Sequence, residues 1–130
     1  MALDYNQPND TTVVEDGNDD RIYDITDENA EFPGGERANL EWLSNNVQYP
    51  TLALERGIQG RVVVQFIVNK DGSLSDLKVL QSPNELLSQE ALRVVGQMPR
   101  WKPARQGNRI VRSRFNLPIN FTIRDEQKSK

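Results

Sequence analysis

Hydrophobic and polar residues alternate along three stretches of the chain, and this period of two predicts three β-strands. The first stretch runs from Gly60 to Asn69, with one face made only of valines and a phenylalanine. The second, Leu74 to Gln81, follows the turn sequence Asn-Lys-Asp-Gly, which is typical of an antiparallel hairpin. The third and longest is Ile110 to Phe121, whose second face carries Arg112, Arg114, Asn116, Pro118 and Asn120.

Apolar residues that recur every three or four positions predict three helices, two before the first strand and one between the second and third strands. The first runs from about Gly35 to Asn46, and Phe32 can cover its first turn. Tyr49 and Pro50 end this helix, because the residue before a proline avoids the helical region. Pro50 then begins a short second helix to Arg56.

The third helix follows Ser82-Pro83 and ends near Met98, before Pro99. We expect Ser82 with Glu85, or Ser88 alone, to cap it. Trp101, between two prolines, is interpreted as an aromatic plug for the core rather than a stacking platform for a base or sugar. The apolar stripe of the helix consists of Leu87, Ala91, Val94, Val95 and Met98.

These elements predict an α+β fold, a three-stranded antiparallel sheet with helices packed on one face. The hairpin runs up and down, the third helix crosses back, and the last strand lies beside the first, so the strand order is 2-1-3. Pro118 cannot donate a hydrogen bond to a sheet ladder, so the third strand is placed at an edge. The sequence therefore predicts a long, partly open edge that carries arginines.

Charge is distributed unevenly along the chain. The first 31 residues hold ten acids against Arg21 alone, a charge of −9, and since the total is −3 the remainder carries +6. We interpret residues 1–31 as a flexible acidic tail, residues 32–123 as the folded domain and residues 124–130 as a polar tail. For the segment Arg-Ile-Tyr-Asp-Ile-Thr, a short strand or a docked segment is the alternative to a free tail. The positive charge is concentrated in Arg100, Lys102, Arg105, Arg109, Arg112 and Arg114.

Composition excludes several function classes. The chain has no histidine and no cysteine, and so lacks the commonest general base and metal ligand and any thiol nucleophile. The spacing of its scattered acids suggests neither acid–base catalysis nor a metal loop. The arginines could meet phosphates, but a sequence pI near 5.0 and the absence of a base-reading helix or an aromatic row argue against nucleic acid. We expect neither an enzyme nor a nucleic-acid-binding protein.

Several quoted stretches, in order and spacing, resemble the C-terminal domain of the TonB family of energy transducers. They are Phe-Pro-Gly-Gly-Glu from Phe32, Tyr49-Pro50, the strand pair from Gly57 to Ser82, the run from Glu90 to Ala104, and Phe-Asn-Leu-Pro-Ile-Asn-Phe ending at Phe121. The resemblance covers about Phe32 to Thr122. No single motif among them is decisive, and the ordered set is what makes the resemblance specific.

The resemblance implies a periplasmic domain without catalytic residues or cofactor. Its implied partner is the TonB box, a short segment of outer-membrane TonB-dependent transporters, through which inner-membrane energy drives nutrient import. Full-length members carry a transmembrane helix and a proline-rich linker, and work with an inner-membrane motor of the ExbB/ExbD type. No apolar run here is long enough to span a bilayer. We therefore expect a soluble fragment of an inner-membrane-anchored parent.

Candidate partner-binding residues fall in two groups. An open edge strand permits strand addition, in which a peptide binds through main-chain hydrogen bonds. The resemblance also implies that the segment around Tyr49 lies against the transporter, although Tyr49-Pro50 is first of all a structural corner. The candidates are Asn46, Gln48, Tyr49 and Pro50 at the corner, and Ile110, Arg112, Arg114, Asn116 and Pro118 on the strand.

Two alternatives remain open at the level of sequence. The same fold could serve as a structural or sensing appendage of another membrane protein, such as a peptidase or a secretion component, without transporter contact. An open edge can also pair with its own copy, giving an edge-paired or strand-exchanged homodimer.

Overall fold

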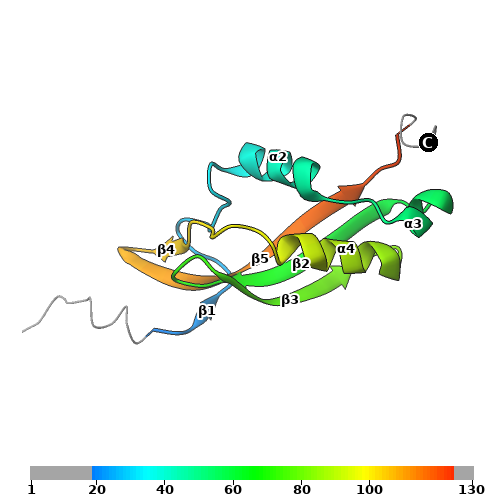
Figure 1. Ribbon diagram of the computed structural model, residues 1–130. Coiled ribbons are helices and arrows are strands. Elements are labelled where there is room, and N and C mark those ends of the chain that lie inside the picture. The colour runs from blue at the N-terminus through cyan, green and yellow to red at the C-terminus, as the bar shows by residue number, and fades with distance from the viewer. Residues whose placement is uncertain (1–18, 125–130) are drawn as a thin grey trace, which may run out of the picture.

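The computed structural model describes residues 19–124. These residues form three helices and a curled sheet, and α2 (Glu36–Asn46) and α4 (Glu85–Val95) lie over the same face of the sheet (Figure 1). The short α3 (Thr51–Glu55) follows the Tyr49-Pro50 corner. No helix in the described part of the chain is long and apolar enough to cross a membrane.

The central strands confirm the predicted order. β2 (Gly60–Val68) pairs antiparallel with β3 (Leu74–Gln81) on one side and with β5 (Arg109–Phe121) on the other. The inner face of β2 is fully buried. On the outer face of the sheet, the side chain of Gln65 on β2 is hydrogen-bonded to that of Asn116 on β5 at 3.1 Å. The fully buried positions of β2 are Val62, Val64, Phe66 and Val68.

The sheet has two more strands than the sequence predicted. β4 (Ala104–Gln106) forms a tight hairpin with the start of β5, in which Gln106 lies opposite Arg109. The two residues between them include Gly107 at φ 64°, a conformation that glycine adopts without strain. β1 (Ile22–Tyr23) pairs parallel with Arg112 and Ser113 of β5.

The core lies between the sheet and α4. Fully burying an aliphatic or aromatic side chain stabilises the fold by about 1.5–3 kcal/mol. The main contribution of α4 to the stability of the fold is therefore the burial of its predicted apolar stripe. Four stripe residues are buried and Met98 is packed against them. The helix is capped by Asn84, whose side chain accepts a hydrogen bond from the backbone N–H of Leu86 at 2.8 Å, and not by Ser82, Glu85 or Ser88 as predicted.

Trp101 closes the other end of the core, as predicted. It is only 3% exposed and packs edge-on against Phe66 and Phe115, with ring centroids 5.2 Å and 4.8 Å away. Phe32, ahead of α2, packs against both Trp101 and Trp42 at 6.0 Å. This aromatic cluster connects the start of α2 to the middle of β5.

Candidate functional site

The outer edge of β5 is only partly open. On the side away from β2, β4 pairs with Arg109–Val111 and β1 pairs with Arg112 and Ser113. From Arg114 to Phe121, no strand within residues 19–124 pairs on that side. The prediction of an open edge is therefore wrong around Ile110 and Arg112, where the chain itself supplies the neighbouring strands. We call Arg114–Phe121 the open edge.

The acidic segment before the domain covers β5 at Arg112 and Ser113, next to the part that β4 covers. Asp19 accepts a hydrogen bond from Arg109 at 2.9 Å, Asp24 pairs with Arg114 at 2.6 Å, and Arg112 donates to the backbone carbonyl of Asp20 at 2.8 Å. Within Arg-Ile-Tyr-Asp-Ile-Thr the structure has the short docked strand that was the alternative to a free tail, and these opposite charges and the β1 ladder hold it. Residues 1–18 lie outside the described part of the chain.

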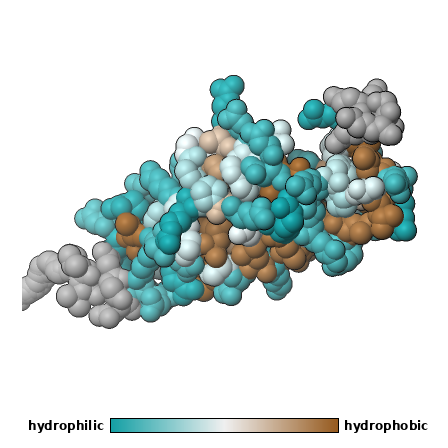
Figure 2. Space-filling model, viewed as in Figure 1, coloured by the Kyte–Doolittle hydropathy of each residue, from teal (hydrophilic) through white to brown (hydrophobic). Residues whose placement is uncertain are grey.

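Arginines and acids thus meet at one end of the molecule. Figure 2 shows mostly hydrophilic residues where β1, β4 and the start of β5 come together. The contacts are unequal, since the Asp19 side chain is 7% exposed whereas that of Asp24 is 70% exposed. Exposed ion pairs contribute about 0–1 kcal/mol and are screened by salt. The buried Asp19 is therefore the main anchor of the segment.

Docking of this segment is expected to depend on pH. The pKa of Asp19 is held well below its ordinary value, chiefly by the side-chain hydrogen bond from Arg21. Arg21 belongs to the docked segment itself, so the part of this effect that depends on docking is the ion pair between Asp19 and Arg109 of β5, which is lost when Asp19 is protonated. Amide hydrogen exchange at Ile22 and Tyr23 should therefore accelerate as the pH falls below about 4 and toward the lowered pKa of Asp19, beyond the intrinsic pH effect.

The control for this prediction is Asp19→Asn, which should show the faster exchange already at neutral pH and little further change on acidification. Protection of Tyr23 that is unaffected by both acid and this substitution would contradict the role of Asp19.

The predicted residues beyond Ser113 lie on the open edge. Asn116 and Pro118 are exposed, and Arg114 is partly exposed beside Asp24. Pro118 lies opposite Val63 of β2 and has no N–H to offer on either side. The edge therefore offers backbone donors on both sides of Pro118 but none at that position.

The Tyr49-Pro50 corner is a structural joint. The Tyr49 hydroxyl donates to the carbonyl of Ile58 at 2.5 Å, and its ring lies edge-on to Phe121 with centroids 5.6 Å apart. Burial raises the pKa of the Tyr49 phenol, as expected for a hydroxyl packed against the core. Pro50 directly precedes α3 with φ −60°. The corner thus attaches the end of α2 to the last residue of β5.

An ion pair on α4, between the buried Glu90 and the partly exposed Arg93, fixes the chain that leads to this corner. Glu90 accepts the backbone N–H of Gln48 at 2.6 Å, and Arg93, paired with Glu90 at 2.7 Å, donates to the carbonyl of Asn46 at 3.0 Å. The Asn46 side chain donates to the carbonyl of Trp42, so its amide is used within the chain, whereas Gln48 is exposed. Sequence reasoning missed Glu90 and Arg93, whose i, i+3 spacing on a helix was the available signal.

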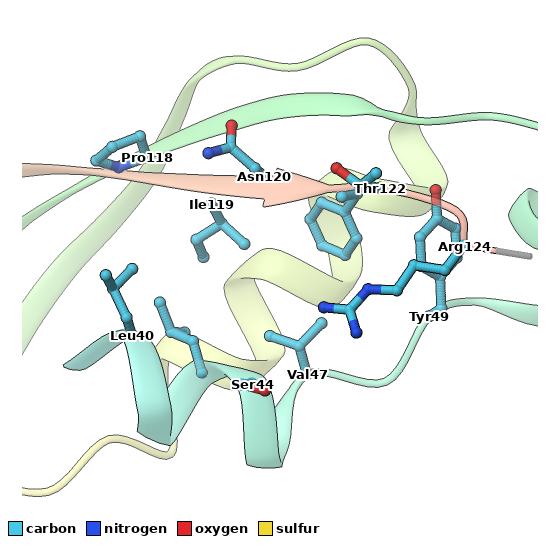
Figure 3. Close-up of a pocket in the computed structure, with 11 residues that line it drawn as sticks. Leu40, Ser44, Val47, Tyr49, Pro118, Ile119, Asn120, Thr122 and Arg124 are labelled. Carbon is cyan, nitrogen blue, oxygen red and sulfur yellow. The ribbon is translucent and has the colours of Figure 1, made fainter. Parts of the chain in front are cut away.

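A groove of about 400 Å³ separates α2 from the end of β5. In Figure 3, Leu40, Ser44 and Val47 project from the α2 side toward Ile119 on β5, and the Arg124 guanidinium reaches in beside Val47. Tyr49 and Pro118 also border it. A second hollow of about 370 Å³ contains Gln48, Tyr49 and Pro50 with Glu90 and Arg93. Of the candidate residues at the corner, Tyr49 is therefore the one that also lines the groove beside the candidate strand residue Pro118.

The described residues contain no cluster of acidic side chains arranged to hold a metal ion. The site consists of the unpaired main chain of the open edge and the apolar side chains that line the groove. An unpaired strand edge beside a groove is suited to a peptide in extended conformation.

Comparison with known proteins identifies the family. Residues 45–123 match the family described as Gram-negative bacterial TonB protein C-terminal. The chain belongs to this family. The TonB protein of Helicobacter pylori is 29% identical over 85 residues, covering 65% of this chain and 28% of that protein. The TonB protein of Pseudomonas aeruginosa is 38% identical over 76 residues, covering 58% and 22%.

A solved structure supports the same relationship. The solution NMR structure of the TonB C-terminal domain of Helicobacter pylori has a TM-score of 0.52 and 26% identity, covering 72% of this chain and 88% of that one. A second solution structure of the same domain has a TM-score of 0.50 and 27% sequence identity. The match covers 66% of this chain and 90% of that one. The chain spans about a quarter of the length of the two TonB proteins above.

The match to the TonB family separates two parts of the site. The open edge and the Tyr49-Pro50 corner lie inside residues 45–123, whereas β1 and nearly all of α2 precede them. The groove therefore has one wall inside the matched region and one wall contributed by α2 from outside it.

Proposed function

We propose that this chain is the periplasmic, partner-binding domain of a TonB-type energy transducer. It binds the TonB box of an outer-membrane TonB-dependent transporter by strand addition to the open edge Arg114–Phe121. Its parent is anchored in the inner membrane and coupled to an ExbB/ExbD-type motor, so that proton-motive energy drives import of nutrients such as iron-siderophores, vitamins or glycans. The role is protein interaction, without catalysis or a cofactor.

The observation that carries this proposal is the unpaired edge of β5 inside the region that matches the TonB family. The structure also contains an extended segment paired to the same strand, since β1 lies parallel to Arg112 and Ser113. Arg114, Asn116 and Pro118 are directly accessible to an added strand, whereas Ile110 and Arg112 become accessible only if β4 and β1 move. Gln48, Tyr49 and Pro50 provide a second contact at the corner.

The expected affinity is modest. A strand along the open edge forms about four main-chain hydrogen bonds at roughly 1 kcal/mol each, and ordering the peptide offsets part of this. Without side-chain contacts the dissociation constant would lie at about 1 mM or above. Such contact is reversible, as suits a device that must release its partner.

Strand addition predicts a specific sensitivity to the partner's backbone. Neighbouring N–H groups of an extended peptide point to opposite sides, so only alternate ones reach β5. Of two TonB-box peptides N-methylated at adjacent central residues, one should bind like the unmodified peptide and the other about tenfold or more weakly. NMR titration of labelled protein measures both affinities and locates the shifted amides.

The unaffected peptide of the pair serves as the control for changes in peptide conformation. Equal affinities for both methylated peptides, or shifts confined to residues outside the open edge and the Asn46–Pro50 corner, would refute docking by strand addition.

A further inference from the structure

The groove lies between α2 and the open edge, where side chains of an added strand would enter it. Side chains of a strand alternate between the two faces of a sheet, and those on one face are about 6.6 Å apart along the strand. Ile119 and Phe121 point to the inner face, toward the groove. A strand added beside them would place every second side chain on that same face, between β5 and α2.

The opposite wall of the groove carries an exposed leucine beside Ser44. Leu40 is 60% exposed although it belongs to the apolar stripe of α2, and Leu43 and Val47 continue that stripe along the groove. A volume of about 400 Å³ lies within the range of about 300–1,000 Å³ that is typical of ligand pockets. An added strand with apolar side chains on its inner face would cover Leu40.

We propose that α2 is a specificity element, which selects partner strands that carry bulky apolar side chains at alternate positions. The occupant is an extended segment of the partner protein, with its backbone on Arg114–Phe121 and its apolar side chains against Leu40 and Val47. This inference rests on the proposed function and adds a selective contact from a helix that precedes the matched region.

The test uses two acetylated and amidated ten-residue peptides. One alternates valine and threonine and has a glutamate at each end, and the other has serine in place of its two central valines. Burying the additional methyl groups in the groove should make the valine peptide bind about tenfold more tightly. In Leu40→Ser this preference should fall to about threefold, because one wall of the groove has lost its apolar surface.

Leu52→Ser is the matched control, since Leu52 is an exposed leucine on α3 that is 48% exposed and does not line the groove. It should keep the tenfold preference. Ser44→Phe, which fills the groove from α2, should weaken the valine peptide and leave the serine peptide nearly unchanged. Circular dichroism and the unperturbed shifts of β2 establish that each variant is folded.

The outcomes separate this inference from the proposed function. If both peptides shift the amides of Arg114–Phe121 with equal affinity, or if Leu40→Ser keeps the tenfold preference, strand addition stands and the role of α2 is refuted. If neither peptide shifts these amides at millimolar concentration, both are refuted. A dimer in light scattering that Leu40→Ser dissociates would assign the groove to a second copy of the chain and overturn the inference.

Discussion

Gly72→Ala is expected to lower the free energy of unfolding by about 3 kcal/mol. Gly72, in the turn between β2 and β3, has φ 87°, where a residue with a Cβ atom is strained by about 1–2 kcal/mol. A Cβ atom there would lie 2.3 Å from the carbonyl oxygen of Trp101. Relieving that overlap must move the Trp101 backbone, whose N–H donates to Gly72 at 2.9 Å, and overpacking of this kind costs about 1–3 kcal/mol.

Urea denaturation followed by tryptophan fluorescence measures this loss. Gly57→Ala is the control, because Gly57 has a similar φ of 68° but no atom within 4 Å of the added Cβ. It should cost only the conformational strain. Equal losses in the two variants would show that the contact with Trp101 contributes nothing. The result matters for the site, since Trp101 packs on Phe115, which belongs to the open edge.

The central sheet could be predicted because its strands are buried on one face. A register shift by one residue would expose Val62, Val64 and Phe66 to solvent, so the period of two determines both strand and face. The short connection through Asp71 and Gly72 then leaves a hairpin as the arrangement for β2 and β3. The order 2-1-3 follows from the right-handed crossover through α4.

β1 could not be predicted from local pattern. A strand of two residues has no periodicity, and it is held by pairs about 90 positions apart, Asp19 with Arg109 and Asp24 with Arg114. The sequence shows both charge clusters, but the acids were assigned to solvent and the arginines to a partner. The opposite net charges of the acidic segment and the domain are the signal that could have predicted contact between the acids and the arginines.

The β4–β5 hairpin has a local signal in the sequence of its turn. Gly107-Asn108 lies between two extended segments, and Gly-Asn at such a place is typical of a two-residue hairpin. β4 itself has only three residues, so it shows no alternation. Recognising the hairpin would have shown that Ile110 is paired.

The groove depends on a distance that helical periodicity does not give. The spacing of Leu40, Leu43 and Val47 predicts an apolar helix face but not how closely that face approaches the sheet. Leu43 is buried, while Leu40, one turn earlier, is left exposed beside β5. How far a helix lies from a strand is set by packing at both of its ends, here by Phe32 and by the Tyr49 corner.

Glu90→Ala is expected to lower the free energy of unfolding by about 2–3 kcal/mol and to loosen the Asn46–Pro50 segment. The substitution leaves the N–H of Gln48 and the guanidinium of Arg93 without their shared acceptor. A buried donor without a partner costs about 1–3 kcal/mol, and the loss at Arg93 is reduced because its side chain is 35% exposed.

Glu90→Gln distinguishes hydrogen bonding from charge, because the amide oxygen can still accept from Gln48 but carries no charge for Arg93. We expect amide exchange at Gln48 to accelerate at least tenfold in Glu90→Ala and only slightly in Glu90→Gln. Affinity for a TonB-box peptide should fall in the alanine variant if the corner contributes to binding as proposed. Unchanged exchange at Gln48 in Glu90→Ala would mean that the corner is held by Tyr49 alone, through its bond to Ile58 and its contact with Phe121.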